Sequence, residues 1–419
     1  MSRGRTATRR TVARHGRLRS PHPALQALSI AGVAVLVALV SVVGIAGYHV
    51  WDAAATVARN AVDIGGDDAL PPEIGAIEGG ANILLVGTDS CEGQDLRVFA
   101  RCGIDDDGGE RNDVTMLVHI SDNPRRVTVV SIPRDMVVDI PQCTGADGSA
   151  SSEAVEPINA SYARGGLACA AKTVEELTGE QIQFAAAIRW TGVINLSDAV
   201  GGVDVCLAGD VSDNNTGIDL TAGTHTLKGV EALQFLRMRH GIGDGSDLGR
   251  ISNQQQFMSS LVRKLRSDEV LHNPATLLGF AGVALDQVRD KQLVLSSGLA
   301  DPTRMVQLAM ALRDVPYDEI VFVQYPTGMS GNAVLPIKDA ADDLFAALRD
   351  NRPIALSGDA SGVDALVVTG EATEPSASAP SSSSPASSAP TGSPTDAATL
   401  SPSISGQTAK EITCTVPER

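Results

Sequence analysis

Two patterns of hydrophobic and polar positions alternate along residues 82–350. Short apolar runs bounded by turn residues are typical of buried strands, and apolar residues that recur every three or four positions are typical of helices. The short runs predict strands at residues 82–87, 113–120, 126–132, 184–190, 203–207 and 319–324. The periodic stretches predict helices at residues 192–202, 229–239, 247–265, 302–313 and 337–350. Because strands and helices alternate, we predict an α/β sandwich around one sheet.

Residues 229–265 form two predicted helices joined by the Gly-rich loop HGIGDGS, residues 240–246. The first helix carries Arg237 and Arg239 near its end, and Ser246 is the expected N-cap of the second. Spacings of three and four place three polar residues on one face of the second helix: Asp247, Arg250 and Gln254. Guanidinium groups and helix N-termini both bind phosphate oxygens, so this arrangement predicts an anion site. Two ordinary helices with solvated charged faces would have the same spacing.

Charged residues also stand where the predicted strands meet loops: Asp89, Arg111, Asp113, Arg134 and Asp135. In an open α/β sheet, such strand ends line the ligand crevice. Two carboxylates from adjacent strands could share a Mg²⁺ ion, which takes oxygen ligands and usually keeps waters and substrate phosphates. The alternative is that each aspartate caps a turn and each arginine forms a surface ion pair.

An apolar stretch at residues 25–50, free of Asp, Glu, Lys and Arg, predicts a transmembrane helix. Tyr48 and Trp51 stand at its outer end, and the Arg-rich segment 1–24 precedes it. The positive-inside rule predicts a single-pass protein of the cell membrane, with a cytoplasmic N-terminus and everything after Trp51 outside. A cleaved signal peptide, with small residues at 53–55, is the alternative. Residues 51–79, rich in Ala, Gly and acidic residues, are predicted to form an extracellular stalk.

The net charge of the chain is −17, and the part after residue 50 carries 26 basic against 50 acidic residues, a net charge of −24. A body with this charge is not a general nucleic-acid binder, so we expect no nucleic-acid partner. Any polyanionic ligand must instead be held by a local cluster of arginines.

The C-terminal part of the chain changes in composition. Residues 356–405, rich in Ser, Pro and Ala, are predicted to be a disordered linker, because such a composition cannot bury a core. Residues 406–419 then form a short C-terminal tail that contains Cys414.

Six cysteines suit an extracellular domain. Proximity in the sequence favours the pairs Cys91–Cys102 and Cys143–Cys169, which leaves Cys206 for Cys414. Six cysteines allow about fifteen connectivities, so other pairings stay open.

Five sequence blocks occur in order along the chain: GTDS at 87–90, RNDVTMLVHI at 111–120, VTVVSIPRDM at 127–136, INASYARGG at 158–166 and RMRHGIGDGSDLGRISNQQQF at 237–257. Together they resemble the signature blocks of the LytR-CpsA-Psr family. The resemblance covers residues 82–265, with weaker matching to residue 350. It implies a catalytic domain at residues 80–355, folded as an α-β-α sandwich around a central mixed sheet.

The resemblance also implies an activity. Members of this family resemble phosphotransferases that take a glycopolymer from a polyprenyl-pyrophosphate carrier in the lipid bilayer. They join it through a phosphodiester to peptidoglycan, outside the cell. The reaction would make the chain a membrane-anchored enzyme that depends on Mg²⁺, for which Mn²⁺ is an alternative.

The implied roles carry over residue by residue. Asp89 and Asp113 match the aspartates that the family associates with the metal. The pyrophosphate-binding arginines match Arg111, Arg134, Arg237, Arg239 and Arg250. Asp247 matches an acidic residue beside them, and Gln254 matches the glutamine of the second helix, which the resemblance implies to bind the pyrophosphate together with the arginines. The implied catalytic set is Asp89, Arg111, Asp113, Arg134, Asp247 and Arg250.

One position departs from the family pattern, and two questions stay open. Asn253 stands where the family commonly has arginine, which removes one candidate arginine at the rim of the site.

Either Asp247 or Asp135 could accept the proton of the attacking hydroxyl. A pyrophosphate hydrolase, or a wall protein that binds lipid-linked glycan without catalysis, would have much the same residues.

Overall fold

The computed structural model describes residues 55–65, 80–99, 109–145, 148–267, 274–331, 333–356, 363–374 and 397–418, together with residues 28, 30, 52, 102 and 360. The chain divides into two compact units, Met1–Ala53 and Ala54–Arg419. The predicted transmembrane stretch 25–50 lies outside the described residues except for Leu28 and Ile30, and segment 1–24 lies wholly outside them. Among the described helices, none has both the length and the apolar character needed to cross a bilayer.

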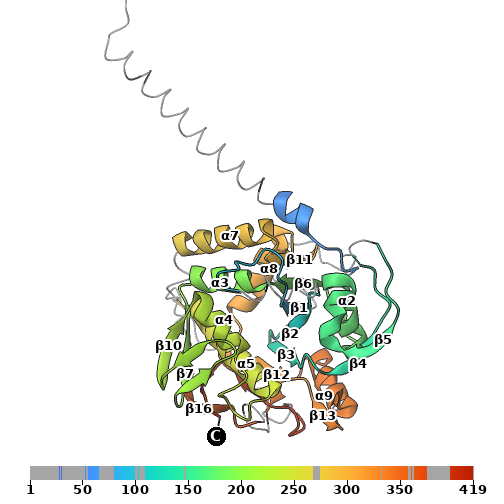
Figure 1. Ribbon diagram of the computed structural model, residues 1–419, viewed down its shortest axis with the longest axis vertical. Helices are drawn as coiled ribbons and strands as arrows, with labels where there is room; N and C mark the ends of the chain where they lie inside the picture. Colours follow the sequence, from blue (N-terminus) through green and yellow to red (C-terminus); the bar gives the residue numbers. More distant parts are fainter. Residues whose placement is uncertain are drawn as a thin grey trace, which may run out of the picture. The chain divides into compact units, whose positions relative to one another are not determined.

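A seven-stranded sheet forms the centre of the second unit (Figure 1). Its strands are, in spatial order, β11 (Leu293–Leu295), β6 (Phe184–Ile188), β1 (Ala81–Thr88), β2 (Asn112–Ile120), β3 (Val127–Ile132), β12 (Ile320–Gln324) and β18 (Gly406–Thr408). The pairs β1–β6 and β3–β12 are parallel. The other neighbours are antiparallel, so the predicted mixed central sheet is confirmed.

Helices cover both faces of this sheet, because successive strand residues point to opposite sides. Leu84 and Leu117 belong to a core shared with α2 (Ser161–Thr178) and α9 (Lys338–Arg349). Ile83 and Met116 belong to a second core shared with α8 (Pro302–Arg313), against which α5 (Asp247–Arg266) also packs. The sheet therefore lies between two helical layers (Figure 1).

Three further helices complete the layer that contains α5 and α8. They are α3 (Trp190–Ala199), α4 (Gly229–Arg237) and α7 (Pro274–Arg289). α3 packs against both α4 and α7, and α4 packs against α5. These helices surround the part of the sheet formed by β1, β2 and β6.

A second sheet packs against α4 and α5. Its spatial order is β10 (Gly223–Leu227), β7 (Val203–Leu207), β19 (Glu411–Thr415) and β16 (Leu366–Glu371). Val203, Val205 and Leu207 share a buried core with Phe235 of α4 and Phe257 of α5. This core packs α4 and α5, the two helices of the predicted anion site, against the second sheet.

Shorter elements connect these layers. The part of the chain that the structure describes also forms four two-stranded pairs: β4 (Val137–Ile140) with β5 (Ala154–Pro157), β8 (Val211–Asp213) with β9 (Ile218–Leu220), β13 (Thr327–Ser330) with β14 (Ala333–Pro336), and β15 (Ile354–Ala355) with β17 (Ala398–Thr399). Two 3₁₀ helices, η3 (Ile158–Ala160) and η4 (Tyr317–Glu319), precede α2 and β12.

Three predicted elements inside the domain had bounds that were wrong by two or three residues. The helix expected at 192–202 spans Trp190–Ala199. The strand expected at 184–190 ends at Ile188, since Trp190 already begins α3. The helix expected at 229–239 ends at Arg237, because Met238 has an extended backbone. Arg237 therefore closes the helix, while Arg239 lies in the loop that follows.

The segments predicted as stalk, linker and tail contribute to the folded unit. Val62, in the predicted stalk, pairs with Ser296 beside β11. β16 lies inside the predicted linker 356–405, and residues 375–396 of that linker lie outside the described residues. The predicted tail supplies β18 to the central sheet and β19 to the second sheet. The tail is thus part of the fold, because its apolar strand residues find partners far away in the sequence.

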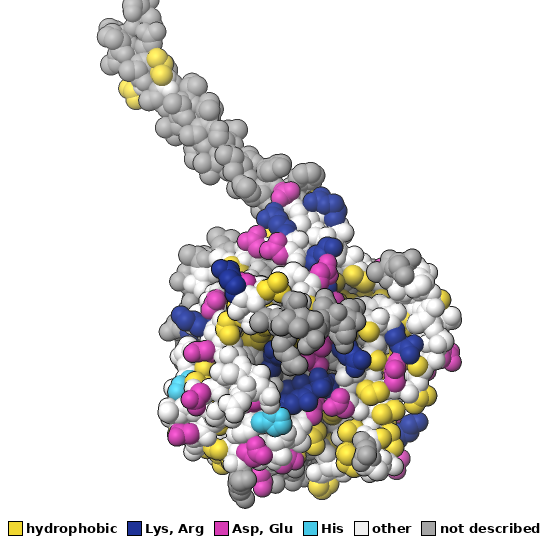
Figure 2. Space-filling model, in the orientation of Figure 1, with side chains coloured by type: hydrophobic (Ala, Val, Ile, Leu, Met, Phe, Trp, Pro, Cys, Tyr) yellow, Lys and Arg dark blue, Asp and Glu magenta, His cyan; other side chains and the backbone are white. Residues whose placement is uncertain are grey.

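Basic side chains are unevenly distributed on the surface. On the face shown in Figure 2, Lys and Arg side chains gather near the centre, and acidic side chains border them. Such a local concentration is what an acidic chain needs in order to hold an anion.

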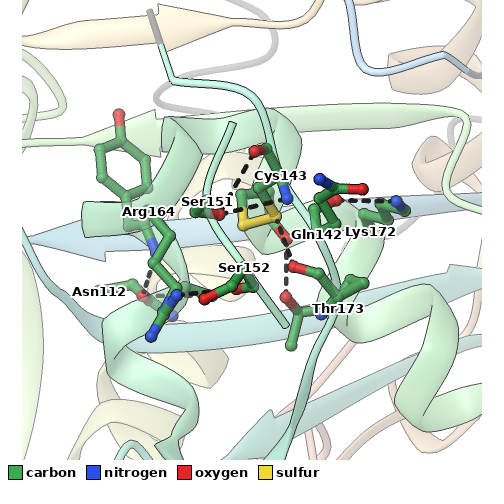
Figure 3. Close-up of a disulfide and its surroundings, with 12 residues drawn as sticks. Asn112, Gln142, Cys143, Ser151, Ser152, Arg164, Lys172 and Thr173 are labelled. Carbon is green, nitrogen blue, oxygen red and sulfur yellow. Dashed lines mark hydrogen bonds between the residues drawn. A yellow bond between two sulfur atoms is a disulfide. The ribbon is translucent and has the colours of Figure 1, made fainter. Parts of the chain in front are cut away.

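The three predicted disulfides are confirmed: Cys91–Cys102, Cys143–Cys169 and Cys206–Cys414. Figure 3 shows the second, which ties the loop after β4 to α2. Beside it, Lys172 Nζ donates to the backbone oxygen of Gln142 at 2.9 Å. The third joins β7 to β19 and so fastens the C-terminal strand to the domain.

Candidate active site

Three strand ends of the central sheet meet at one edge. β1 ends at Thr88, and its antiparallel neighbour β2 begins at Asn112. β3 runs antiparallel to β2 and ends at Ile132, so Arg134 follows at the same edge. Antiparallel neighbours place the end of one strand beside the beginning of the next. For this reason the charged residues predicted at strand ends come together.

Asp89 and Arg111 pair across this edge. The backbone N–H of Arg111 donates to Asp89 Oδ1 at 2.8 Å, and the backbone N–H of Asp89 donates to the oxygen of Arg111 at 3.2 Å. The Arg111 side chain is exposed. Burial raises the pKa of Asp89 despite the hydrogen bond from Arg111, and the nearby charge of Asp113 raises it further. Two carboxylates therefore lie close enough to repel one another.

Asp113 is also paired with an arginine. Arg134 Nη1 donates to Asp113 Oδ1, and Arg134 Nε lies 3.5 Å from Asp135 Oδ1. The Asp135 side chain is 47% exposed, whereas that of Asp113 is 19% exposed. Arg134 thus links a half-buried carboxylate at the site to one that faces solvent.

A second charged cluster comes from the Gly-rich loop and the start of α5. Asp247 Oδ1 lies 2.9 Å from Arg239 Nη2 and 2.7 Å from Arg250 Nη2. Arg250 Nη2 also donates to the backbone oxygen of Asp113 at 3.1 Å. This bond joins the two clusters, so the anion site predicted on α5 and the charged strand ends form one site.

Arg250 is the most deeply placed guanidinium of the site, with 4% of the residue exposed. Burial lowers its pKa, and the carboxylate of Asp247 opposes that effect. An arginine side chain nevertheless stays protonated in proteins. The site therefore keeps a buried positive charge.

Several buried polar atoms of this site have no hydrogen-bond partner within the described residues. They are Nε of Arg134, Nε of Arg250, Nη2 of Arg239 and both carboxylate oxygens of Asp247. The contacts between Asp247 and its two arginines are therefore close ion pairs without hydrogen-bond geometry. Buried polar groups are normally satisfied, so unused guanidinium donors indicate a place for an anionic ligand.

The start of α5 differs in one detail from the prediction. Ser246 occupies the N-cap position, but its side chain makes no capping hydrogen bond. The backbone N–H of Ser246 instead donates to Asp244 Oδ1 at 2.9 Å. The N-terminal N–H groups of α5 are thus not capped by Ser246, which suits a helix end that contacts a ligand.

Arg237 and Gln254 occupy the same region with different partners. The Arg237 guanidinium carbon lies 4.3 Å from the ring centroid of Trp190, and the Phe99 ring centroid lies 4.9 Å from that of Trp190. Gln254 Nε2 donates to the backbone oxygen of Leu236 at 3.0 Å and ties α5 to α4. Sequence reasoning missed Trp190 and Phe99, although the scarcity of aromatic residues could have drawn attention to them.

A buried network behind the site was also missed. Arg189 donates from Nε and Nη2 to the two carboxylate oxygens of Glu110, at 2.9 and 2.8 Å. The Thr88 hydroxyl donates to the same carboxylate at 2.6 Å. Glu110 directly precedes Arg111, so its place beside the second sequence block was the available signal. The network holds the end of β1, the start of β2 and the start of α3 together.

A cavity of about 340 Å³ borders the charged cluster. β1, β2 and β6 form one wall, and α3, α4, α5 and α7 form the other. Its lining is mainly aliphatic and aromatic, and the charged residues in that lining are Asp113, Arg237 and Arg250. One continuous site therefore combines apolar volume with guanidinium groups.

Asp89 and Asp113 are the residues that could hold Mg²⁺. Among the described residues, no group of three or more His, Cys, Asp and Glu side chains could hold a metal ion. Mg²⁺ is usually bound by one or two carboxylates and completes its shell with waters and substrate phosphates. Two mutually repelling carboxylates beside an anion site fit that mode of binding, and they do not fit an all-protein metal cage.

Comparison with known sequences identifies the family to which the chain belongs. A sequence model of the LytR_cpsA_psr family matches residues 53–338. The chain belongs to the LytR-CpsA-Psr family. The family match ends before β16, β18 and β19, so the C-terminal strands lie outside it.

Three relatives show how far the similarity extends. The chain is 30% identical to the cell wall biosynthesis protein LcpA of Corynebacterium glutamicum, over 75% of this chain and 63% of that protein. It is 31% identical to the polyisoprenyl-teichoic acid–peptidoglycan teichoic acid transferase TagU of Enterococcus faecalis, over 47% of this chain and 57% of that protein. The solved LytR-Csp2A-Psr enzyme from Actinomyces oris has a TM-score of 0.48 and 21% identity, over 67% of this chain and 96% of that chain. The chain spans less than two thirds of the length of LcpA and of TagU.

The position that departs from the LytR-CpsA-Psr pattern does not lie where we predicted. Asn253 is fully buried, and its Oδ1 accepts a hydrogen bond from the Thr415 hydroxyl at 2.7 Å. The prediction that Asn253 replaces an arginine at the rim of the site was wrong. The side chain lies under the C-terminal strand, which the sequence pattern did not connect to α5.

Proposed function

We propose that this protein transfers a glycopolymer from a polyprenyl-pyrophosphate carrier to peptidoglycan, at the outer face of the cell membrane. The observation that carries the proposal is the apolar cavity that borders guanidinium donors which make no hydrogen bond to any described residue. A polyprenyl pyrophosphate has the matching chemistry, with a long hydrocarbon chain attached to two phosphates. The name of the related TagU describes a transfer of this kind for that protein.

In the proposed complex, the prenyl chain occupies the cavity and the pyrophosphate lies against the arginines. Arg134, Arg239 and Arg250 would donate to phosphate oxygens, because each keeps a buried donor that makes no hydrogen bond to the described residues. Arg111 and Arg237, both exposed, would contact the outer phosphate or the first sugar. A bound Mg²⁺ (or Mn²⁺), held by Asp89 and Asp113, would supply charge neutralisation at the phosphates.

The reaction is an in-line displacement at phosphorus. A sugar hydroxyl of peptidoglycan attacks the phosphorus next to the glycan, and a new P–O bond forms. The bond to the bridging oxygen breaks, and polyprenyl phosphate leaves. The guanidinium groups stabilise the charge that develops on the phosphate oxygens, which is the main task of a phosphotransferase.

The hydroxyl proton needs an acceptor. Of the two carboxylates considered from the sequence, Asp247 is held between Arg239 and Arg250. Asp135 is 47% exposed and lies 3.5 Å from Arg134 Nε. Asp135 is therefore the more accessible acceptor, and Asp247 holds the two arginines close to each other by attracting both.

The test uses the purified full chain in detergent with a short-chain polyprenyl-pyrophosphate glycan and Mg²⁺. Wild type, Arg250→Ala, Asp89→Ala and the control Arg126→Ala are compared with and without peptidoglycan. We expect linked product that requires peptidoglycan and that is lost only in the two site variants. Release of polyprenyl phosphate without peptidoglycan would identify a hydrolase instead. Arginine-dependent binding without turnover would identify a glycan-binding wall protein.

A further inference from the structure

The C-terminal segment 413–418 contacts the Gly-rich loop that carries the arginine site. The backbone N–H of Gly241 donates to Glu418 Oε2 at 2.8 Å, and the backbone N–H of Glu418 donates to the oxygen of Gly241 at 3.0 Å. The backbone N–H of Gly243 donates to the oxygen of Val416 at 3.0 Å. The loop is thus paired to the C-terminal segment almost as a strand would be.

The loop has little freedom on its other sides. Gly241 has a φ of +81°, and a Cβ atom there would lie 2.4 Å from the backbone oxygen of Ser212. Asp213 Oδ2 accepts the backbone N–H groups of Arg239 and His240, at 3.2 and 3.3 Å. The segment 413–418 therefore closes the open side of a loop that β8 already holds.

The same segment is anchored to α5 through buried polar contacts. The Thr415 hydroxyl lies within hydrogen-bond distance of Asn253 Oδ1 and Gln256 Oε1, at 2.7 and 2.8 Å. Gln256 Nε2 donates to the backbone oxygens of Thr413 and Cys206, at 2.6 and 2.9 Å. α5 is the helix that supplies the aspartate, the arginine and the glutamine of the polar stripe to the site. The segment thus contacts both pieces of chain that deliver the charged cluster.

We propose that residues 413–418 position the active site, with Glu418 as the residue that holds the Gly-rich loop. Arg239 and Asp247 flank this loop, and their 2.9 Å contact depends on where the loop lies. A guanidinium group displaced by a fraction of an ångström presents its donors poorly to phosphate. Glu418 is exposed and does not line the cavity, so it acts through the loop and touches no substrate. The consequence for pyrophosphate rests on the proposed function.

The test compares variants of the full chain by hydrogen exchange and by ligand binding. Glu418→Ala removes the acceptor, Glu418→Gln keeps an acceptor oxygen, and a chain ending at Thr415 removes all contacts of residues 416–418 with the loop. Glu411→Ala is the matched control, because Glu411 Oε2 accepts the N–H of Thr408, at 2.6 Å, away from the loop. Farnesyl pyrophosphate is the probe, and Trp190 in the cavity lining provides a fluorescence signal.

We expect faster exchange at residues 240–250 in Glu418→Ala and, more strongly, in the shortened chain. The affinity for farnesyl pyrophosphate should fall roughly tenfold in Glu418→Ala, the scale of a lost charge-assisted hydrogen bond. Glu418→Gln should bind and exchange like wild type, and Glu411→Ala should do the same. A melting temperature that stays close to wild type would separate positioning from general stability.

Two results would overturn the proposal. Unchanged exchange at residues 240–250 in the shortened chain would show that the segment does not hold the loop. Faster exchange with unchanged affinity would show that holding the loop has no bearing on the ligand. Wild type itself could bind no farnesyl pyrophosphate while the hydrogen-exchange rates at residues 240–250 still rise in the expected order of variants. That result would contradict the proposed function, but it would support the role of the segment in holding the loop.

Discussion

The two ends of β3 carry arginines in contrasting surroundings. Arg126, just before the strand, donates from Nε to Glu319 at 2.8 Å and from Nη1 to both oxygens of Asn351 at 3.0 Å. The space that Arg126 lines has a volume of about 10 Å³, and the cavity of about 420 Å³ at the same end of the sheet is lined by Asn351 and Ser121 but not by Arg126. Arg134, just after the strand, has an Nε without a hydrogen-bond partner among the described residues, and it lies beside the cluster that borders a cavity of about 340 Å³. A guanidinium with its donors satisfied stabilises the fold, whereas unused donors beside a large cavity indicate binding.

The ion pairs alone do not distinguish Arg126 from Arg134. Arg126 and Arg134 both form close carboxylate pairs, and their side chains are 17% and 25% exposed. The difference comes from the neighbours, since Arg134 shares its region with Arg250, Arg239 and Asp247. Several guanidinium groups in one region repel one another unless anions lie between them. At this end of the sheet, Asp113 and Asp247 lie between the guanidinium groups, while Nε of Arg134 and of Arg250 still make no hydrogen bond to the described residues.

The strongest test of this comparison replaces one arginine at each edge. Arg250→Ala should lower the rate of acceptor-dependent product formation by roughly 10²–10³, the loss seen when one donor to a developing charge is removed. Arg126→Ala should leave that rate within about twofold, yet lower the free energy of unfolding by about 1–3 kcal/mol through the unpaired Glu319. An assay of product formation measures the change in activity, and denaturant unfolding measures the change in stability. Equal losses of activity in both variants would contradict the distinction between the edges.

The next test replaces one carboxylate with an amide beside each end of β3. Asp113→Asn should lower activity by roughly 10², and it should raise the Mg²⁺ concentration needed for half-maximal rate, because one of two oxygen ligands loses its charge. Glu319→Gln should change neither quantity and should cost about 1 kcal/mol of stability. A titration of the initial rate with Mg²⁺ measures the effect. An unchanged Mg²⁺ dependence in Asp113→Asn would remove Asp113 from the metal site.

A smaller effect is expected from the aromatic support of Arg237. Trp190→Leu keeps an apolar lining but removes the ring over which Arg237 lies. Loss of a cation–π contact should weaken farnesyl pyrophosphate binding by roughly two- to tenfold. Tyr317, which lies under Arg266 at 4.4 Å, offers the matched control Tyr317→Leu, which should leave binding unchanged. Isothermal titration calorimetry would measure both, and equal effects of the two substitutions would contradict a specific role for Trp190.

Much of the site could be predicted because its residues lie next to strongly patterned elements. β1, β2 and β3 are short apolar runs with charged neighbours, so the sequence alone predicts Asp89, Asp113 and Arg134 at strand ends. The periodicity of α5 places Arg250 and Gln254 on one face, and both line the cavity. Local patterns of this kind depend only on strand and helix periods, which a sequence carries in full.

Other features depend on partners that are far away in the chain. Apart from Cys414, which was left to pair with Cys206, nothing in the local pattern of Glu411–Thr415 indicates that it forms a strand between β7 and β16, some 208 and 45 residues earlier. The resemblance to the family placed Asn253 at the rim of the site, because a sequence pattern does not say what covers each face of a helix. Arg189 and Glu110 meet only when β6 and β2 lie on either side of β1.

By itself, the sequence determined five strands of the central sheet (β1, β2, β3, β6 and β12) and the charged residues at the strand ends, whereas it did not predict α2, which covers one face of that sheet. Proximity in the sequence favoured Cys91–Cys102 and Cys143–Cys169 but left other pairings open. The strands and helices follow from hydrophobic periods, which are set by backbone geometry. The family followed from the resemblance of five sequence blocks. Only the tertiary structure decided that the two charged groups form one site, that the cavity adjoins it, and that the C-terminal tail gives a strand to each of two sheets. Those outcomes depend on which surfaces pack together, and packing is chosen by burial and hydrogen bonding across the whole chain.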